Sequence, residues 1–150
     1  MIKSIFVPDE TAMMSLGARL ASYVSGPALI HLQGDLGAGK STLARGFIKA
    51  QGYVGHVKSP TYTLIEPYQL SDRTIYHLDL YRLSDPEELE FIGIRDIFSD
   101  DSICLVEWPD KGKGFLPEAD LLITISHKNE GREVKFQPLS ELTLEIINEL

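Results

Sequence analysis

The sequence has a single cysteine and no long apolar run. Cys104 is the one cysteine in 150 residues, so no internal disulfide can form, and its place in the apolar run ICLV predicts a buried, unreactive thiol. No segment reaches the ~18 consecutive apolar residues of a membrane-spanning helix, and the N-terminal MIKSIFVPDE lacks the apolar core of a signal peptide. We therefore expect a cytoplasmic protein that does not engage a membrane.

Positive charge is also scarce. Lysine and arginine total 14 against 22 aspartates and glutamates, which gives a formal net charge of −8 and a pI near 4.9. Nucleic-acid binding over a broad face requires clustered basic residues. This composition argues against direct DNA or RNA binding, although a partner protein could supply the basic surface.

The chain has the length of one domain, 1–150, and contains no repeat, low-complexity tract or linker. Four helices are predicted, over residues 8–26, 40–52, 85–99 (with a break at Gly93) and 140–150. Strands are predicted over residues 27–33 and 102–108, in a hairpin of 61–70 with 74–83, and in a second hairpin within 119–139. Because strands and helices intermix, we expect an α/β fold with a mixed β-sheet and helices packed on it.

The segment GDLGAGKST, residues 34–42, matches the phosphate-binding pattern G-x-x-x-x-G-K-[ST] between a predicted strand and a predicted helix. Glycines let backbone N–H groups approach an anion, and the helix directs its positive end to the same point. Lys40 can reach the β- and γ-phosphates, and the Ser41 hydroxyl can ligate Mg²⁺. The alternative is an ordinary glycine-rich turn before a helix. The pattern and its placement favour a nucleotide-binding protein of the P-loop NTPase type.

The rest of the sequence indicates which nucleotide binds and which reaction is favoured. The N-K-x-D segment usual in guanine-specific GTPases is absent, which favours ATP. The chain is short for a P-loop kinase, which needs room for a second substrate and a lid. Hydrolysis or nucleotide-dependent switching is the more natural interpretation.

Two predicted buried strands end in a carboxylate, at Asp79 and at Glu107. Either could hold Mg²⁺ while the other orients the attacking water, and sequence spacing does not assign the two roles. The alternative for each is a solvated acid at a strand end.

The segment KSPTYTL, residues 58–64, lies where switch segments of P-loop hydrolases occur, which makes Thr61 and Thr63 candidates for contact with Mg²⁺ or the γ-phosphate. From physics alone a proline-punctuated loop entering a strand is slightly favoured. His77 is more often structural than catalytic at such a position. Trp108 either turns toward the site rim, because Pro109 ends the strand, or anchors the following loop to the core.

Five segments occur in a characteristic order: GDLGAGKST, SPTYTL, HLDLYRL, DPEELEFIGI and CLVEWPDKGKGFLP. Together they resemble the bacterial TsaE (YjeE) family, and the resemblance extends from about Pro8 to Arg132. It implies a slow Mg²⁺-dependent ATPase that acts with the TsaB–TsaD pair in threonylcarbamoyl transfer to a tRNA adenosine. ATP turnover would reset that assembly, and tRNA would be reached only through the complex.

The resemblance also implies roles for individual residues. Gly37, Ala38, Gly39, Lys40, Ser41 and Thr42 would hold the phosphates of ATP. Ser41 and Glu107 would bind Mg²⁺, Asp79 would serve hydrolysis by orienting water, and Thr61 would be the switch threonine. Glu10 and Arg132 match positions near the nucleotide.

Two other functions remain open on the sequence. A nucleotide-gated binding module would use ATP to order residues 59–64 and dock a partner, without useful hydrolysis. A small P-loop kinase would place phosphate on a second substrate.

Overall fold

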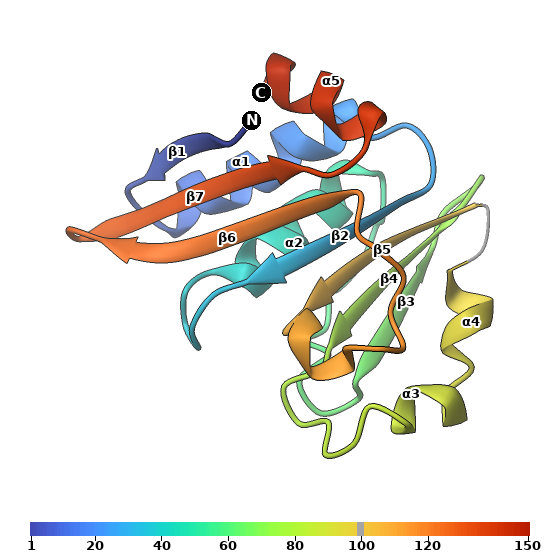
Figure 1. Ribbon diagram of the computed structural model, residues 1–150. Coiled ribbons are helices and arrows are strands. Elements are labelled where there is room, and N and C mark those ends of the chain that lie inside the picture. The colour runs from blue at the N-terminus through green and yellow to red at the C-terminus, as the bar shows by residue number, and fades with distance from the viewer. Residues whose placement is uncertain (99–100) are drawn as a thin grey trace.

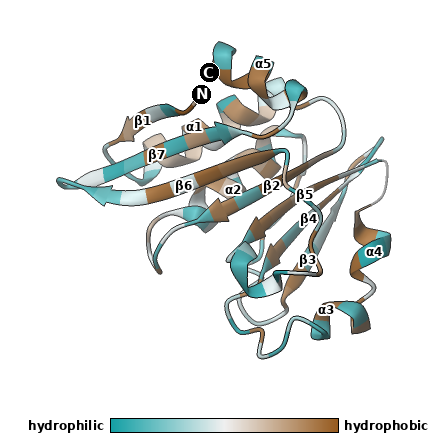
Figure 2. Ribbon diagram, in the orientation of Figure 1, coloured by the Kyte–Doolittle hydropathy of each residue, from teal (hydrophilic) through white to brown (hydrophobic). Residues whose placement is uncertain are grey.

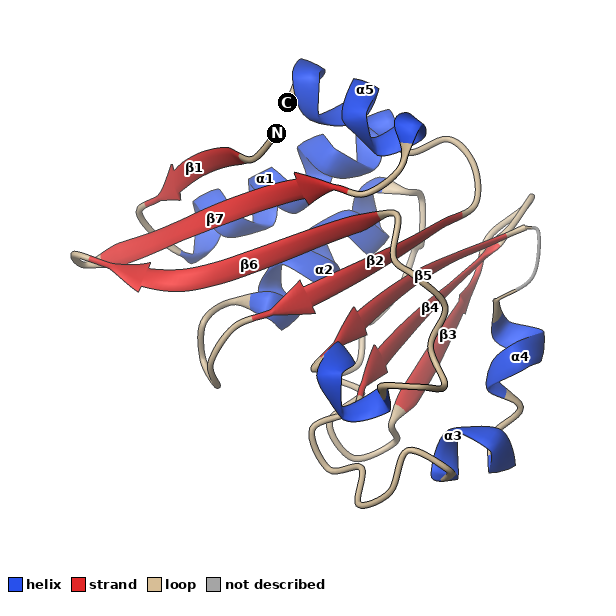
Figure 3. Ribbon diagram, in the orientation of Figure 1, coloured by secondary structure: helices blue, strands red, loops and turns tan. Residues whose placement is uncertain are grey.

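The computed structural model describes residues 1–98 and 101–150, and its strands form one sheet in the order β1-β7-β6-β2-β5-β4-β3 (Figure 1). The strands are β1 (Lys3–Val7), β2 (Ala28–Gln33), β3 (Ile65–Gln69), β4 (Thr74–Asp79), β5 (Ser102–Glu107), β6 (Leu121–Lys128) and β7 (Gly131–Pro138). The helices are α1 (Glu10–Tyr23), α2 (Lys40–Ala50), α3 (Glu88–Phe91), α4 (Ile94–Ile97) and α5 (Glu141–Glu149), with one 3₁₀ turn, η1 (Pro109–Gly112) (Figure 3).

The sheet is mixed, as predicted. Strands β4, β5, β2 and β6 are parallel neighbours, whereas β3, β7 and β1 pair in antiparallel fashion. Ligand sites in such sheets form beyond the carboxyl ends of the parallel strands. The ends of β2, β4 and β5 therefore bring residues 34–41, Asp79 and Glu107 to one edge of the sheet.

Helices α1 and α2 cover one face of the sheet, and their contact is very close. A Cβ atom on Gly17 would lie 2.1 Å from the carbonyl oxygen of Leu43, and one on Gly46 would lie 2.1 Å from that of Met14. Any larger residue would therefore separate the two helices. This packing fixes the position of α2 and hence of the loop that precedes it.

The core has two parts, one on each face of the sheet. Residues such as Leu20, Leu43 and Phe47 from α1 and α2 pack on one face, and Leu89 and Ile94 from the α3–α4 region pack on the other. The central strands are hydrophobic along much of their length, as expected for strands buried on both faces (Figure 2). Cys104 is buried in the second part, as predicted, and burial raises the pKa of its thiol to about 11.

The sequence prediction missed β1 and overestimated the first hairpin. β1 pairs with β7, with Ile5 opposite Val134, and its five residues carry only a short alternating signal. The expected strand 61–70 begins only at Ile65, because Leu64 has a φ of 72° and residues 60–64 form a turn. The expected strand 74–83 ends at Asp79, and a turn follows.

The remaining elements follow the prediction with shorter bounds. The expected helix 85–99 is two single turns, α3 and α4, on either side of Gly93, which has a φ of 71°. Its last expected residue, Ser99, lies outside the described residues. Asp9 and Ser140 cap α1 and α5 as predicted, each accepting from the backbone N–H three residues on.

Candidate functional site

The glycine-rich loop, residues 34–41, joins β2 to the start of α2. Gly37 and Gly39 have φ values of 78° and 116°, which glycine adopts without strain. Gly39 is the N-cap of α2, so no side chain caps the helix, and its first turn contains no acid. The first N–H groups of α2 and the positive end of its dipole are therefore available to an anion.

Arg132 on β7 holds this loop from the other side. Its Nε atom donates a hydrogen bond to the Ala38 carbonyl at 3.0 Å, and its Nη2 atom donates to the Gly37 carbonyl at 3.3 Å. These bonds use carbonyl oxygens and occupy no loop N–H group, although the Ala38 N–H donates to the Asp35 carbonyl at 3.1 Å. Arg132 thus positions the loop backbone, an effect that the sequence did not reveal.

Lys40 is folded against its own loop. Its ammonium donates hydrogen bonds to the carbonyls of Gly34 and Asp35, and it lies 4.2 Å from the centre of the Trp108 ring. The residue is 5% exposed. Burial lowers the pKa of Lys40, and the nearby carboxylates of Glu107 and Asp79 oppose that shift. Two backbone carbonyl oxygens and the Trp108 ring thus hold the ammonium at the loop. A bound phosphate could replace these contacts.

Glu107 is at the centre of a chain of three side chains. The Ser41 hydroxyl donates to its carboxylate, with Oγ to Oε distances of 3.0 and 3.2 Å. On the other side, His77 Nε2 lies 2.6 Å from Glu107 Oε2. His77 and Glu107 are both almost fully buried, so this carboxylate has little freedom to reorient.

Asp79 is the partner of Glu107 across the β4–β5 pair. Its Oδ1 atom accepts from the Tyr81 N–H at 3.0 Å, which fixes the carboxylate at the strand end. Burial raises the pKa of Asp79, and the charge of Glu107 raises it further, while the Tyr81 bond, His77 and Lys40 oppose these effects. Two carboxylates side by side at this edge would favour a bound cation.

The glycine-rich loop, Asp79 and Glu107 line one pocket of about 280 Å³. Its wall consists of Leu36, Gly37, Ala38, Gly39, Lys40, Ser41, Thr42, Thr61, Asp79, Glu107 and Trp108. Thr61 reaches the pocket from the loop before β3, and its hydroxyl lies 2.7 Å from that of Ser59. The exposed Thr63 is not part of this wall.

A second pocket of about 230 Å³ adjoins the first across the glycine-rich loop. Gly37, Ala38, Gly39 and Thr42 line both pockets. Glu10 and Arg132 line only the second, together with Pro8, Asp9, Met13 and Glu130. A nucleotide whose phosphates lie in the first pocket could place its nucleoside in the second.

The oxygen ligands present suit Mg²⁺ only if a nucleotide completes the site. Among the residues described, no cluster of three or more His, Cys, Asp or Glu side chains could hold a metal ion alone. Mg²⁺ is typically held by one or two protein oxygens together with phosphate oxygens and water. Ser41 and Glu107, hydrogen-bonded to each other, form such a partial site.

The structure gathers most of the predicted residues around the glycine-rich loop and gives contacts for His77 and Trp108. His77, which the sequence rates as more often structural than catalytic, holds Glu107. Trp108 turns at the end of β5 with a φ of 57°, lies at the pocket wall and also packs on the second part of the core. Both sequence interpretations of Trp108 thus describe part of its environment.

Comparison with known proteins places the chain in a family. The family model described as threonylcarbamoyl adenosine biosynthesis protein TsaE matches residues 7–134. The chain belongs to the TsaE family. It therefore has a role in the biosynthesis of threonylcarbamoyladenosine in tRNA.

Individual relatives agree with this assignment. The tRNA threonylcarbamoyladenosine biosynthesis protein TsaE of Haemophilus influenzae is 48% identical over 148 residues, covering 95% of this chain and 94% of that protein. The Bacillus subtilis protein of the same name is 37% identical over 131 residues, covering 86% and 80%. A crystal structure of Bacillus subtilis YdiB superposes with a TM-score of 0.78 at 27% identity, covering 99% of this chain and 97% of that chain.

The TsaE match covers every residue of the two pockets, whereas α5 lies beyond its end.

No helix in the described part of the chain is long and apolar enough to cross a membrane.

Proposed function

We propose that this TsaE-family chain binds ATP with Mg²⁺ and hydrolyses it slowly in the cytoplasm. In this proposal it acts on the TsaB–TsaD complex during threonylcarbamoyl transfer to tRNA. One observation carries the proposal: the glycine-rich loop, Thr61, Asp79 and Glu107 come from separate segments and line one pocket at the start of α2.

The binding roles follow from the groups at that pocket. The N–H groups around Gly37 to Thr42 would hold the phosphates, and the Lys40 ammonium would exchange its bonds to Gly34 and Asp35 for phosphate oxygens. Ser41 and Glu107 would hold Mg²⁺, which when bound would neutralise charge on the phosphates. Glu10 and Arg132 line the neighbouring pocket, where the nucleoside would lie.

The hydrolytic roles rest on Asp79 and Thr61. Asp79 is fixed by the Tyr81 N–H, and its second carboxylate oxygen is free to accept a hydrogen bond from water. The Thr61 hydroxyl is bonded to the Ser59 hydroxyl of the same loop rather than to Ser41 or Glu107. An incompletely ordered switch loop would keep turnover slow until a partner closes it.

The decisive measurement is ATP hydrolysis by the protein alone, with TsaB–TsaD, and with TsaB–TsaD plus tRNA. We expect slow turnover alone and acceleration by the partner pair. Fast turnover that TsaB–TsaD leaves unchanged would refute the partner role. If ATP binds by calorimetry without turnover in any arm, the chain is a nucleotide-gated binding module, and phosphate on a second substrate would identify a kinase.

The net charge of −8 bears on the RNA part of the proposal. Surplus acid repels phosphate over most of the surface, so the isolated chain should bind tRNA weakly and the complex should supply the main contact. Tight tRNA binding by the isolated chain at physiological salt would contradict this.

A further inference from the structure

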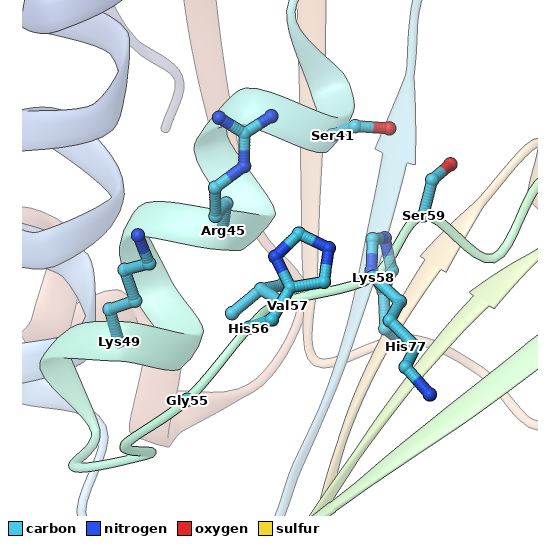
Figure 4. A pocket seen from close by; sticks show the side chains of 9 residues that line it. All are labelled: Ser41, Arg45, Lys49, Gly55, His56, Val57, Lys58, Ser59 and His77. Atoms are coloured by element: carbon cyan, nitrogen blue, oxygen red, sulfur yellow. The ribbon is translucent and has the colours of Figure 1, made fainter.

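A pocket of about 590 Å³ lies on the other side of Ser41 from the glycine-rich loop. Its wall consists of Ser41, Arg45, Lys49, Gly55, His56, Val57, Lys58, Ser59 and His77 (Figure 4). We call it the basic pocket, since three cationic side chains and, within residues 1–98 and 101–150, no acid line it. It is a local exception on a strongly acidic protein, and no sequence motif indicates it.

One wall is a face of α2. Ser41, Arg45 and Lys49 are spaced four residues apart, so they lie one above another on the helix, over about 12 Å. Figure 4 shows the segment from Gly55 to Ser59 running beside this face. Lys58 lines the pocket from this segment, and in this view its side chain extends away from the α2 face.

The cations of this pocket are poorly neutralised. Arg45 Nη1 lies 3.9 Å from Glu10 Oε1, with the two side chains 37% and 74% exposed, so this ion pair is weak. Neither Lys49 nor Lys58 forms an ion pair with any acid in the described part of the chain. The positive charge of Lys49 and Lys58 is therefore available to an anionic ligand in this pocket.

The wall opposite α2 is anchored before any ligand arrives. The Lys58 N–H donates to the Tyr68 hydroxyl at 2.9 Å, and that hydroxyl donates to the Lys58 carbonyl at 3.0 Å. Tyr68 is 3% exposed, and the ring of Tyr53 packs edge-on against it. The backbone at Lys58 is therefore fixed, which lowers the entropy lost when a ligand binds.

The end of the pocket next to the candidate nucleotide site contains an unsatisfied polar atom. His77 is 1% exposed, its Nε2 is bonded to Glu107, and its Nδ1 has no hydrogen-bond partner among the described residues. Because a carboxylate only accepts, Nε2 carries a hydrogen, and Nδ1 is the ring nitrogen left to contact a ligand. Buried polar atoms are seldom left unpaired, and a ligand hydroxyl in the pocket would satisfy this one.

We propose that the basic pocket is a second oxyanion site, which binds a phosphate group separately from the glycine-rich loop. Arg45, Lys49 and Lys58 would supply charge-assisted hydrogen bonds, and His77 Nδ1 would form a further hydrogen bond with the phosphate group. Ser41 lines both pockets, so phosphate released at the nucleotide site would have a neighbouring cationic site. The site itself does not depend on ATP binding.

Amide NMR shifts during a titration with potassium phosphate at constant ionic strength test the proposal. We expect saturable shifts at residues 55–59 in addition to any at residues 37–42. The Lys49→Ala/Lys58→Ala double variant should weaken binding at 55–59 by about tenfold or more. Both side chains are exposed, so the variant should fold, which its spectrum verifies.

Two controls separate this site from general charge and from the glycine-rich loop. The Lys128→Ala/Lys135→Ala variant removes the same charge from the β6–β7 hairpin and should keep full binding. Lys40→Ala should lose any shifts at residues 37–42 and keep those at residues 55–59, whether or not the ATPase proposal holds. If residues 55–59 do not respond, or respond equally in the double variant, the basic pocket is not a phosphate site.

A second titration identifies the source of the phosphate group. The probe is a tetrauridylate without terminal phosphates, used under the same conditions. Binding of inorganic phosphate without the tetranucleotide assigns the site to the free ion. Binding of the tetranucleotide, again lost in the double variant, assigns it to backbone phosphates of RNA. If neither probe binds, the proposal is wrong.

Discussion

His77 Nε2 lies 2.6 Å from Glu107 Oε2 within the sheet, and the two side chains are 2% and 3% exposed. Ser41 donates to the same carboxylate from α2. Glu107 is therefore held between a strand and the helix that follows the glycine-rich loop. A carboxylate fixed in this way can present an oxygen to a cation without first losing rotamer freedom.

Removing the histidine tests this positioning role. In His77→Leu, Glu107 loses its fixed partner, so we expect a several-fold higher Mg²⁺ concentration at half-maximal ATPase activity. His77→Gln keeps an N–H donor and should recover part of the wild-type Mg²⁺ response. If both variants keep the wild-type Mg²⁺ dependence, with matched thermal stability, His77 is a structural residue only.

Asp79→Asn and Glu107→Gln should impair the ATPase differently. If Glu107 holds the metal, Glu107→Gln should raise the Mg²⁺ requirement. If Asp79 orients water, Asp79→Asn should lower kcat by about 100-fold or more while ATP still binds. Steady-state kinetics over a range of Mg²⁺ concentrations, with calorimetry for ATP binding, measures both effects. The reverse pattern would exchange the two roles.

Asp79 should also reduce the stability of the free protein at neutral pH. Its pKa is raised by burial, so the folded state binds more protons than the unfolded state above the ordinary aspartate pKa. Stability therefore decreases as pH rises through that range, and ionised Asp79 is unfavourable at pH 7.

Asp79→Asn removes that charge and keeps an acceptor for the Tyr81 N–H. We expect a higher Tm than wild type at pH 7 without nucleotide. The difference should shrink as pH falls below about 4, where the wild-type carboxyl is protonated. A lower Tm for the variant at pH 7 would show that the ionised carboxylate is stabilising.

Lys40→Ala should abolish turnover. The Lys40 ammonium is bonded to the Gly34 and Asp35 carbonyls of the glycine-rich loop. Alanine would leave the charge of the β- and γ-phosphates unmatched. We expect weaker ATP binding by calorimetry and at least about a 100-fold loss of kcat. Because Lys40 also contacts Trp108, a folding control by circular dichroism is needed. Wild-type hydrolysis in this variant would exclude the glycine-rich loop as the phosphate site.

The fold and most of the candidate site could be predicted because their signals are local. The glycine pattern of residues 34–41 depends on backbone conformations that few other sequences satisfy. The strand ends at Asp79 and Glu107 could be predicted because apolar runs stop there. The structure then pairs these two residues in the β4–β5 register.

Contacts between distant segments could not be predicted in this way. The bonds from Arg132 to the glycine-rich loop, the His77–Glu107 pair and the basic pocket all join residues far apart in sequence. Their formation depends on strand order and on the close α1–α2 contact, which hydrophobic periodicity does not specify. The strand β1 was missed for a similar reason, since it is stabilised by pairing with β7.

Trp108 should report nucleotide binding. Strand alternation places it on the face opposite Glu107, but its φ of 57° turns the chain as β5 ends, and the indole lies against the Lys40 ammonium at 4.2 Å. Tyr81 packs on the same ring, with 4.9 Å between centroids. A phosphate that draws Lys40 away would remove this cation–π contact and change the surroundings of the indole.

The measurement is tryptophan emission during a titration of ATP with Mg²⁺. Trp108 is the single tryptophan of the chain, so the signal has one source. We expect a saturable change in wild type and none in Lys40→Ala at the same nucleotide concentration, once the altered starting emission of that variant is taken into account. Unchanged emission at saturating ATP, with binding confirmed by calorimetry, would mean that Lys40 keeps its place on the ring. In that case Trp108 would serve to anchor η1 to the second part of the core, where its indole already packs.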